Sequence, residues 1–317
     1  MQFTTKIPVQ KSSFPIDYDS KIMLLGSCFA ENMGEKFNYF KFQATTNPFG
    51  IIFNAVSLEK LICRAVENRK FTENDIFFHN ELWHCYEVHS ELSNPDKEVF
   101  LSNLNSILTS AHQHISSLTH CIITLGTSWV YRNIETHEIV ANCHKVPQKQ
   151  FTKELLSINQ TEESLQNIVG LIHSVNPNCN FVFTVSPVRH IKDGFTENTL
   201  SKAHLVAAIH KTITHHPSPI TYFPAFEIMM DELRDYRFYA EDMLHPNQTA
   251  IDYIWMQFFE NYISESVFGL MNEIGSIQKG LQHRPFNPNT ESHQKFLNQL
   301  DLKIKTIQNQ YPFIKFC

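Results

Sequence analysis

The chain has 317 residues, 42% of them hydrophobic and 18% charged, so it can bury a sizeable core and is too apolar to be disordered. A net charge of -6 without a Lys/Arg run excludes the pattern typical of nucleic-acid-binding proteins. No segment approaches the ~20 apolar residues of a membrane span. The N-terminal segment also lacks the apolar stretch of a signal peptide. We therefore expect a cytoplasmic protein that binds neither nucleic acid nor membrane.

The seven cysteines (positions 28, 63, 85, 121, 143, 179 and 317) are odd in number and scattered, without a C-x-x-C pair. A disulfide framework or a zinc knuckle would require paired, regular spacings, so we expect most of them to be buried, reduced thiols. The histidines form no H-E-x-x-H motif. His79, His84 and His89 recur every five residues, which matches neither helix nor strand, and we interpret them as packing or surface residues. We expect neither a bound metal ion nor a cofactor.

Short apolar runs alternate with segments of helical periodicity, which is typical of parallel strands connected by helices. The expected fold is a three-layer α/β/α domain with a mostly parallel sheet of about five strands. The predicted strands span, in chain order, residues 22–25, 42–46, 121–125, 181–185 and 220–223. The apolar stripes of the intervening helices are Leu58, Leu61, Ile62, Ala65 and Val66, then Leu101, Leu104, Leu108, Ala111 and Ile115, then Leu165, Ile168, Val169 and Ile172.

Two segments interrupt this alternation. Residues 71–92 are dense in aromatic side chains, and residues 129–140 have the pattern of a hairpin that turns at 135–137. We expect both to be insertions at a sheet edge or over a site. The α/β domain is predicted to occupy residues 1–270, and residues 271–317 are predicted to form a helical extension that packs on this domain or on a partner subunit. The oligomeric state stays open.

The residues after each strand are of special interest, because ligands of such sheets bind at the carboxyl ends of the strands. Gly26 and Ser27 follow the first strand and precede a helical segment. Gly26 permits a tight turn, and Ser27 would lie at a helix N-terminus, where the dipole and free amides favour an oxyanion. Ser27 is therefore a candidate nucleophile, although this segment by itself favours a capping role until the Asp242/His245 pair is considered. A serine that only caps the helix is the alternative, and the neighbouring Cys28 is interpreted as a small buried residue.

A candidate base and its orienting acid lie near the end of the domain. His245 directly precedes Pro246 and Asn247, which are typical helix-start residues, and Asp242 lies three positions earlier. At this spacing Asp242 can accept the Nδ1 proton of His245 and leave Nε2 facing a serine hydroxyl, which needs such a base to become nucleophilic. Without Ser27, the pair would be an ordinary surface ion pair or cap.

The segment LLGSCFAENMGEKF, together with DMLHP near position 245, resembles the GSCFA family. Further segments fit the family pattern, namely TTNPFG at 45–50, TLGTSWVY at 124–131, NCHK at 142–145, SPVRH at 186–190 and DYRFYAEDMLHP at 235–246. The resemblance covers residues 22–259. It places the chain with the SGNH/GDSL hydrolases, whose flavodoxin-like fold carries a nucleophile after the first strand and an Asp-x-x-His near the C-terminus. It implies a triad of Ser27, His245 and Asp242.

The resemblance also implies an oxyanion hole made by the amides of Ser27 and Gly50 and by a third-block side chain. That block usually reads Gly-x-Asn, whereas this chain has Gly126-Thr127-Ser128. We expect Ser128 to be the third donor. The alternatives are Thr127, Asn47, Asn54 and Asn142.

Candidate substrate contacts are Asn47, Asn142, His144, Arg189 and His190, although Arg189 could equally anchor the acidic loop near Asp242. Together these features predict a serine-dependent esterase or O-acyltransferase that acts on an O-acyl ester. An acylated carbohydrate is the first candidate substrate, through superfamily analogy alone. A binding module with weak or lost catalysis is the competing hypothesis, which the missing third-block Asn supports. A metal-dependent enzyme is a more distant alternative.

Overall fold

The computed structural model describes residues 4–216 and 220–316 and contains a central sheet of five strands. These are β1 (Lys21–Gly26), β2 (Gln43–Thr46), β5 (His120–Leu125), β9 (Asn180–Val185) and β10 (Ile220–Phe223). They pair in parallel in the order β10–β9–β5–β1–β2. The predicted strands are thus confirmed, and the sheet has the 2-1-3-4-5 order of flavodoxin-like folds.

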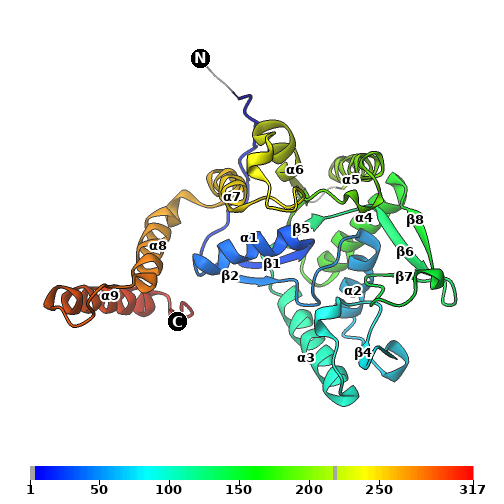
Figure 1. Ribbon diagram of the computed structural model, residues 1–317, viewed down its shortest axis with the longest axis horizontal. Helices are drawn as coiled ribbons and strands as arrows, with labels where there is room; N and C mark the ends of the chain where they lie inside the picture. The colour runs from blue at the N-terminus through cyan, green and yellow to red at the C-terminus, as the bar shows by residue number, and fades with distance from the viewer. Residues whose placement is uncertain (1–3, 217–219, 317) are drawn as a thin grey trace.

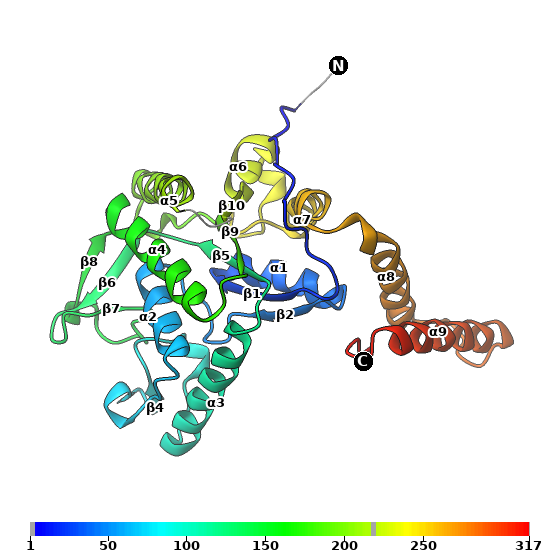
Figure 2. The same ribbon diagram turned by 180° about the vertical axis from the view of Figure 1, so that it is seen from behind.

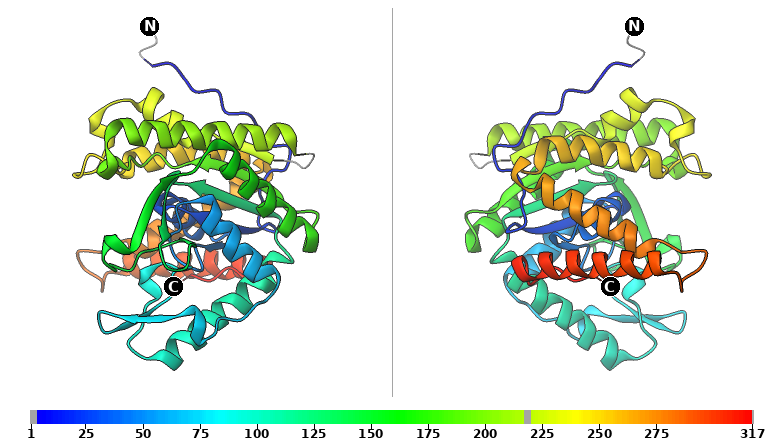
Figure 3. Two further views of the ribbon diagram at one scale, coloured as in Figure 1. Left: turned by 90° about the vertical axis from the view of Figure 1, so that its right-hand side faces the viewer. Right: turned by 90° about the vertical axis from the view of Figure 1, so that its left-hand side faces the viewer.

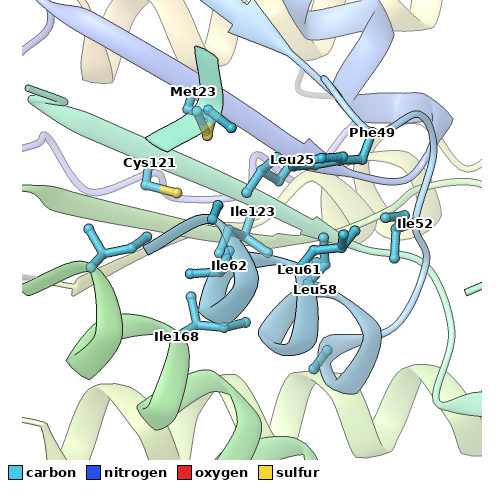
Figure 4. Close-up of a cluster of buried hydrophobic side chains, with 14 of the residues drawn as sticks. Met23, Leu25, Phe49, Ile52, Leu58, Leu61, Ile62, Cys121, Ile123 and Ile168 are labelled. Atoms are coloured by element: carbon cyan, nitrogen blue, oxygen red, sulfur yellow. The ribbon is translucent and has the colours of Figure 1, made fainter. Parts of the chain in front are cut away.

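Helices cover both faces of this sheet and complete the predicted three layers (Figure 1). One side carries α2 (Ala55–Val66), α4 (Ile158–Val175) and α5 (Phe195–His215), with α3 (Lys97–Ile115) beside α2, and the other carries α1 (Cys28–Tyr39) and α7 (Gln248–Tyr262). Successive residues of β1 alternate between the layers. Met23 and Leu25 pack with the first group (Figure 4), whereas Ile22 and Leu24 pack with the second.

The apolar stripes predicted for three helices lie in the core. The stripe residues of α2, α3 and α4 are buried, except that Val66 and Leu101 are only partly buried. Each of these three helices begins at a residue whose side chain caps it. In α4, Ser157 and Gln160 form a capping box. Short elements complete the described chain: α6 (Ala225–Glu227), a π-helix (Ile228–Leu233), and 3-10 helices at Glu73–Asp75, Ser90–Leu92, Gln148–Gln150, Ile191–Asp193, Tyr236–Phe238 and Glu265–Val267.

A three-stranded antiparallel sheet follows β5 in the chain. It consists of β6 (Trp129–Asn133), β7 (Ile139–Val140) and β8 (Phe151–Leu155), in the order β7–β6–β8. The predicted hairpin is confirmed as β6 and β7. The strand β8 was not expected, because its centre is polar and lacks an apolar run. In residues 71–92, β3 (Phe77–His79) and β4 (Leu82–His84) form a separate hairpin.

The C-terminal part of the chain is helical and consists of α8 (Phe268–Gln282) and α9 (Glu291–Gln310). These helices extend from the side that carries α7, away from α5 and the β6–β8 sheet (Figures 1 and 2). Figure 3 shows α9 lengthwise. Leu300 and Ile307 of α9 are buried in a cluster that includes Tyr18, so the extension packs on its own domain. The domain boundary after residue 270 stays a prediction.

The cysteines of the described chain are free thiols. Cys85, Cys121 and Cys179 are buried, whereas Cys28, Cys63 and Cys143 are half-buried, and Cys317 lies outside the described residues. Among the helices that can be described, none has the length and apolar character needed to cross a membrane.

His144 packs the loop after β7 beneath the β3–β4 hairpin. Its side chain is almost fully buried, its Nε2 lies 2.7 Å from the carbonyl oxygen of Cys85, and its ring centroid lies 4.7 Å from that of His84. Burial lowers the pKa of His144 to about 4, and the nearby His84 and His89 contribute to this shift. The folded chain therefore holds the neutral ring at neutral pH.

Replacing Gly26 by Ala tests the turn after β1. Gly26 has a φ of 126°, and a Cβ atom there would lie 2.0 Å from the Thr124 carbonyl oxygen, so the backbone would have to move. We expect Gly26→Ala to lower the free energy of unfolding by about 3 kcal/mol, measured by urea denaturation. Gly170→Ala in α4 is the control: a Cβ there meets open space, so it should be neutral or stabilising by up to about 1 kcal/mol. Equal effects of the two substitutions would contradict the steric argument.

The buried His144 predicts a loss of stability in mild acid. The unfolded chain binds the proton near pH 6.5 and the folded chain only near pH 4, so the unfolded state is protonated first as the pH falls. This group leaves the free energy of unfolding unaffected above pH 6.5 and lowers it by about 3 kcal/mol as the pH falls to 4.

The His144→Asn variant should have a flatter dependence of unfolding free energy on pH, measured by urea denaturation between pH 7 and pH 4. His137→Asn is the matched control, because His137 is exposed and should leave the slope unchanged. Both histidines have a positive φ, 50° and 57°, which Asn tolerates. If the slope is unaltered in His144→Asn, the loss of unfolding free energy in acid arises from other groups.

Candidate active site

The predicted site lies at the point where the strand order reverses. β2 pairs on one side of β1, and β5, β9 and β10 follow on the other, so a crevice is expected outside the carboxyl ends of β1 and β5. Ser27 directly follows β1, and Gly126 directly follows β5. Residues 52–54 lie between these ends. The Ile52 N–H donates to the Gly26 carbonyl at 2.9 Å, and the Gly126 N–H donates to the Phe53 carbonyl at 2.9 Å.

Ser27 is the N-cap residue of α1. Its backbone is extended (φ -74°, ψ 173°), and its Oγ accepts a hydrogen bond from the Phe29 N–H at 3.3 Å. The side chain is fully buried. The capping role that the sequence suggested is therefore realised. A hydroxyl that accepts one hydrogen bond keeps its own proton available, so capping does not exclude a second role.

Asn47 holds the turn that precedes Ser27. Its Oδ1 accepts the Gly26 N–H at 2.8 Å, and its Nδ2 donates to Glu31 Oε1 at 3.5 Å. The residue is buried and has a φ of 40°. Both ends of this side chain are thus engaged within the protein.

Asp242 and His245 lie side by side in the loop before α7. Asp242 Oδ2 lies 2.5 Å from His245 Nδ1, and Asp242 Oδ1 accepts the N–H groups of Leu244 and His245 at 2.9 and 3.0 Å. The backbone N–H groups of His245 and Leu244, together with the His245 ring, lower the pKa of Asp242 to about 2. Because an ionised carboxylate can only accept, Nδ1 carries the proton of this bond, and Nε2 is the acceptor of the neutral ring. Both side chains are about half exposed (45% and 47%).

Arg189 anchors the loop that carries this pair. Its N–H donates to the Leu244 carbonyl at 3.3 Å, and its Nη2 donates to the Met243 carbonyl. Its guanidinium lies over the rings of Tyr236 and Tyr239, 5.2 and 4.3 Å from their centroids. These contacts correspond to the anchoring role, one of the two roles expected for Arg189.

Ser27 and His245 come from opposite ends of the chain and are brought to one side of the sheet by helix packing. Phe37 of α1 packs on Trp255 and Phe258 of α7, with ring centroids 5.1 and 5.9 Å apart. Within the described residues, no hydrogen bond joins Ser27 Oγ to His245. Their mutual approach is therefore part of the proposal below.

The three expected oxyanion donors already have partners inside the protein. The Ser27 N–H donates to the Thr124 carbonyl at 3.0 Å, and the Gly50 N–H donates to the Asn47 carbonyl at 2.7 Å. The Ser128 N–H donates to Ser201 Oγ at 2.7 Å, and its hydroxyl donates to the Ser201 carbonyl at 3.1 Å. A substrate oxygen would have to displace or share one of these bonds.

A cleft of about 420 Å³ opens between the strand ends and the β6–β8 sheet. Among the predicted substrate residues, Asn142 and His190 line this cleft, whereas Asn47, His144 and Arg189 do not. The predicted triad residues do not line it either. Its walls combine aromatic and amide side chains with a few charged ones, including Phe53, Asn54, Thr127, Trp129, Tyr131, Asn142, Gln148, Phe151, His190 and Lys192.

His190 connects the cleft with the Asp242–His245 loop. Burial lowers the pKa of His190 to about 4, and electrostatic interactions with Lys202 and His245 contribute to this shift. The His190 ring is therefore neutral at neutral pH, and it lies close enough to His245 for the two rings to interact electrostatically. Its buried Nε2 has no partner within the described chain.

Lys202 is a buried lysine beside the candidate site that was not expected from the sequence. Its buried Nζ donates to the Gly126 and Ser186 carbonyls at 2.8 and 2.7 Å, so it joins the ends of β5 and β9. Burial lowers its pKa to about 7. The available signal was its spacing, because Lys202 shares the buried stripe of α5 with Leu205 and Ile209. Within residues 4–216 and 220–316, no three His, Cys, Asp or Glu side chains gather where a metal ion could bind.

Comparisons with known proteins bear on this assignment. The model of the GSCFA family matches residues 21–258, and that of the GSCFA domain protein, C-terminal domain, matches residues 274–316. The comparison with curated proteins gives no match. Among solved structures, the chain is similar to an acetyl xylan esterase (Est2A) from the rumen bacterium Butyrivibrio proteoclasticus, with 11% identity and a TM-score of 0.40. The similarity covers 86% of this chain and 66% of the esterase, and so distant a likeness says nothing about activity. The family models cover most of the sequence, and the chain therefore belongs to the GSCFA family.

Proposed function

We propose that the chain is a serine-dependent acyl esterase or O-acyltransferase of the SGNH/GDSL type, with Ser27, His245 and Asp242 as its triad. The observation that carries this proposal is the Asp242–His245 pair. Its Oδ2–Nδ1 distance is 2.5 Å, and two backbone N–H groups hold the second carboxylate oxygen. This arrangement fixes the tautomer and orientation of the imidazole, which is the role of the acid in a catalytic triad.

In the proposed reaction, Ser27 Oγ attacks the carbonyl carbon of an ester while His245 Nε2 accepts the hydroxyl proton. His245 then gives this proton to the departing alkoxide, and the acyl group stays on Ser27. Attack by water regenerates Ser27 and releases the acid, whereas attack by another hydroxyl transfers the acyl group. Asp242 stays ionised throughout, because its pKa is about 2, and stabilises the imidazolium.

The surroundings of Ser27 support its choice over Cys28. Ser27 Oγ lies at the N-terminus of α1 and already accepts the Phe29 N–H, so negative charge on this oxygen would be stabilised. Burial raises the pKa of the Cys28 thiol, which disfavours the thiolate that nucleophilic attack requires.

The cleft supports a small ester as the substrate. Its volume of about 420 Å³ suits a small-molecule ligand, and its aromatic and amide walls suit a ligand with apolar faces and hydrogen-bonding edges. Asn142 and His190 are the proposed contacts. An O-acylated carbohydrate is the proposed substrate through superfamily analogy.

A ligand-binding module on the same fold is the second candidate. One observation favours it: the Ser27, Gly50 and Ser128 groups expected to form the oxyanion hole are all hydrogen-bonded within the protein. Loss of one such donor typically costs about 10²- to 10³-fold in rate. A chain without any free donor would bind an ester and turn it over slowly or not at all.

The triad is tested with p-nitrophenyl acetate and a fluorophosphonate probe. Wild-type protein should hydrolyse the ester and gain the mass of one phosphonyl group. Ser27→Ala should lose both properties, and His245→Ala and Asp242→Asn should each lower kcat by about 10⁴-fold. Initial rates and intact-mass analysis of the four proteins give the result.

Cys28→Ala is the matched control for the nucleophile. It alters the residue beside Ser27 without touching the triad, so turnover and labelling should stay within a few-fold of wild type. Loss of labelling in Cys28→Ala but not in Ser27→Ala would assign the nucleophile to the thiol. Wild-type protein that neither turns over nor labels would favour the binding module.

A further inference from the structure

We propose that Asn54 supplies the side-chain donor of the oxyanion hole, in the place of the third-block Asn that this chain lacks. This role rests on the acyl-transfer function proposed above. Three observations support it. Asn54 lies between the two strand ends, its side-chain amide has a fixed orientation with an unbonded nitrogen, and the competing side-chain donors are hydrogen-bonded or lie elsewhere.

Asn54 lies at the same edge of the sheet as Ser27. The preceding residues connect both strand ends, since the Ile52 N–H binds the Gly26 carbonyl and the Phe53 carbonyl binds the Gly126 N–H. Adjacent parallel strands are about 4.8 Å apart, so a side chain that follows this bridge reaches the space beyond β1 and β5. Ser27 begins α1 on one face of the sheet, and Asn54 begins α2 on the other face, both at this same edge.

The side chain of Asn54 is held with its amide nitrogen directed away from the helix. The residue is 4% exposed, and its Oδ1 accepts the Ser57 N–H at 2.8 Å as the N-cap of α2. Only the oxygen of an amide can accept an N–H, so this bond fixes the orientation of the group. Within the described chain, Nδ2 has no hydrogen-bond acceptor. It is also not one of the solvent-inaccessible polar atoms that lack a partner, and Asn54 lines the cleft. Nδ2 therefore faces the cleft.

Other candidate side-chain donors are engaged or lie elsewhere. Asn47 Nδ2 binds Glu31, and the Thr127 hydroxyl is paired with Ser201 Oγ. Asn142 also lines the cleft, but it belongs to the loop after β7 and not to the segment that bridges the Gly26 and Gly126 strand ends. A donor that is fixed before the substrate arrives needs no reorganisation when charge develops, which is the property that makes an oxyanion hole effective.

Asn54→Asp and Asn54→Ser test this role. Asp and Ser cap helices about as well as Asn, so both variants keep α2 capped while they remove the amide donor. We expect kcat for p-nitrophenyl acetate to fall by about 10²- to 10³-fold in both, with KM changed much less and the urea midpoint nearly unchanged. Ser157→Asn, which changes the cap of α4, is the control and should keep wild-type kinetics.

A second measurement does not depend on variants. In uniformly ¹⁵N-labelled wild-type protein, the side-chain N–H signal of Asn54 should move downfield when Ser27 carries a phosphonyl group, because the phosphoryl oxygen occupies the oxyanion position. An unmoved signal, or wild-type kcat in both Asn54 variants of an active and labelled enzyme, would overturn the role of Asn54 alone. A wild-type chain without turnover or labelling would overturn the proposed function and this role together.

Discussion

The close approach of Gly26 to β5 is the constraint on which the candidate site depends. A side-chain carbon at this position would meet the Thr124 carbonyl oxygen at 2.0 Å, and the same carbonyl accepts the Ser27 N–H. The Gly26 carbonyl in turn accepts the Ile52 N–H, and the Gly26 N–H binds Asn47. Groups from several segments, including the Asn47 side chain, therefore meet around Gly26, so the end of β1, the start of α1 and the start of α2 are positioned together.

The Asp242–His245 pair is built differently, because its geometry is set almost entirely within one loop. The Ala240 N–H binds the His245 carbonyl at 2.8 Å, and both oxygens of Asp242 are used within three residues. Asn247 then caps α7 immediately afterwards. The Asp242–His245 pair is thus a preformed unit, and the packing of α7 on α1 and the anchor at Arg189 govern its distance from Ser27.

The features that could be predicted from the sequence are those that local spacing or continuous burial determines. All six residues of β5 are buried, and four of them are apolar (Cys121, Ile122, Ile123 and Leu125), which made the strand recognisable. The three-residue spacing of Asp242 and His245 likewise sets their reach. The polar strand β8 depends on pairing with β6 and has no comparable signal. The sequence also offered residue types that can donate hydrogen bonds to an oxyanion. It could not reveal that these donors are already hydrogen-bonded, because Gly50 binds Asn47 across a turn and Ser128 binds Ser201, 73 positions away.

The wall of the cleft is built separately from the rest of the domain. Within the described chain, β6, β7 and β8 pair only with one another, and they occupy one continuous stretch between β5 and α4. Their buried cluster of Val140, Val146 and Phe151 is distinct from the two clusters that enclose the central sheet. Mutation of the cleft-lining positions in this stretch can therefore reshape the space offered to a ligand without altering the two clusters that enclose the central sheet. Ligand preference can then diverge among related chains while the turn that holds Ser27 remains the same.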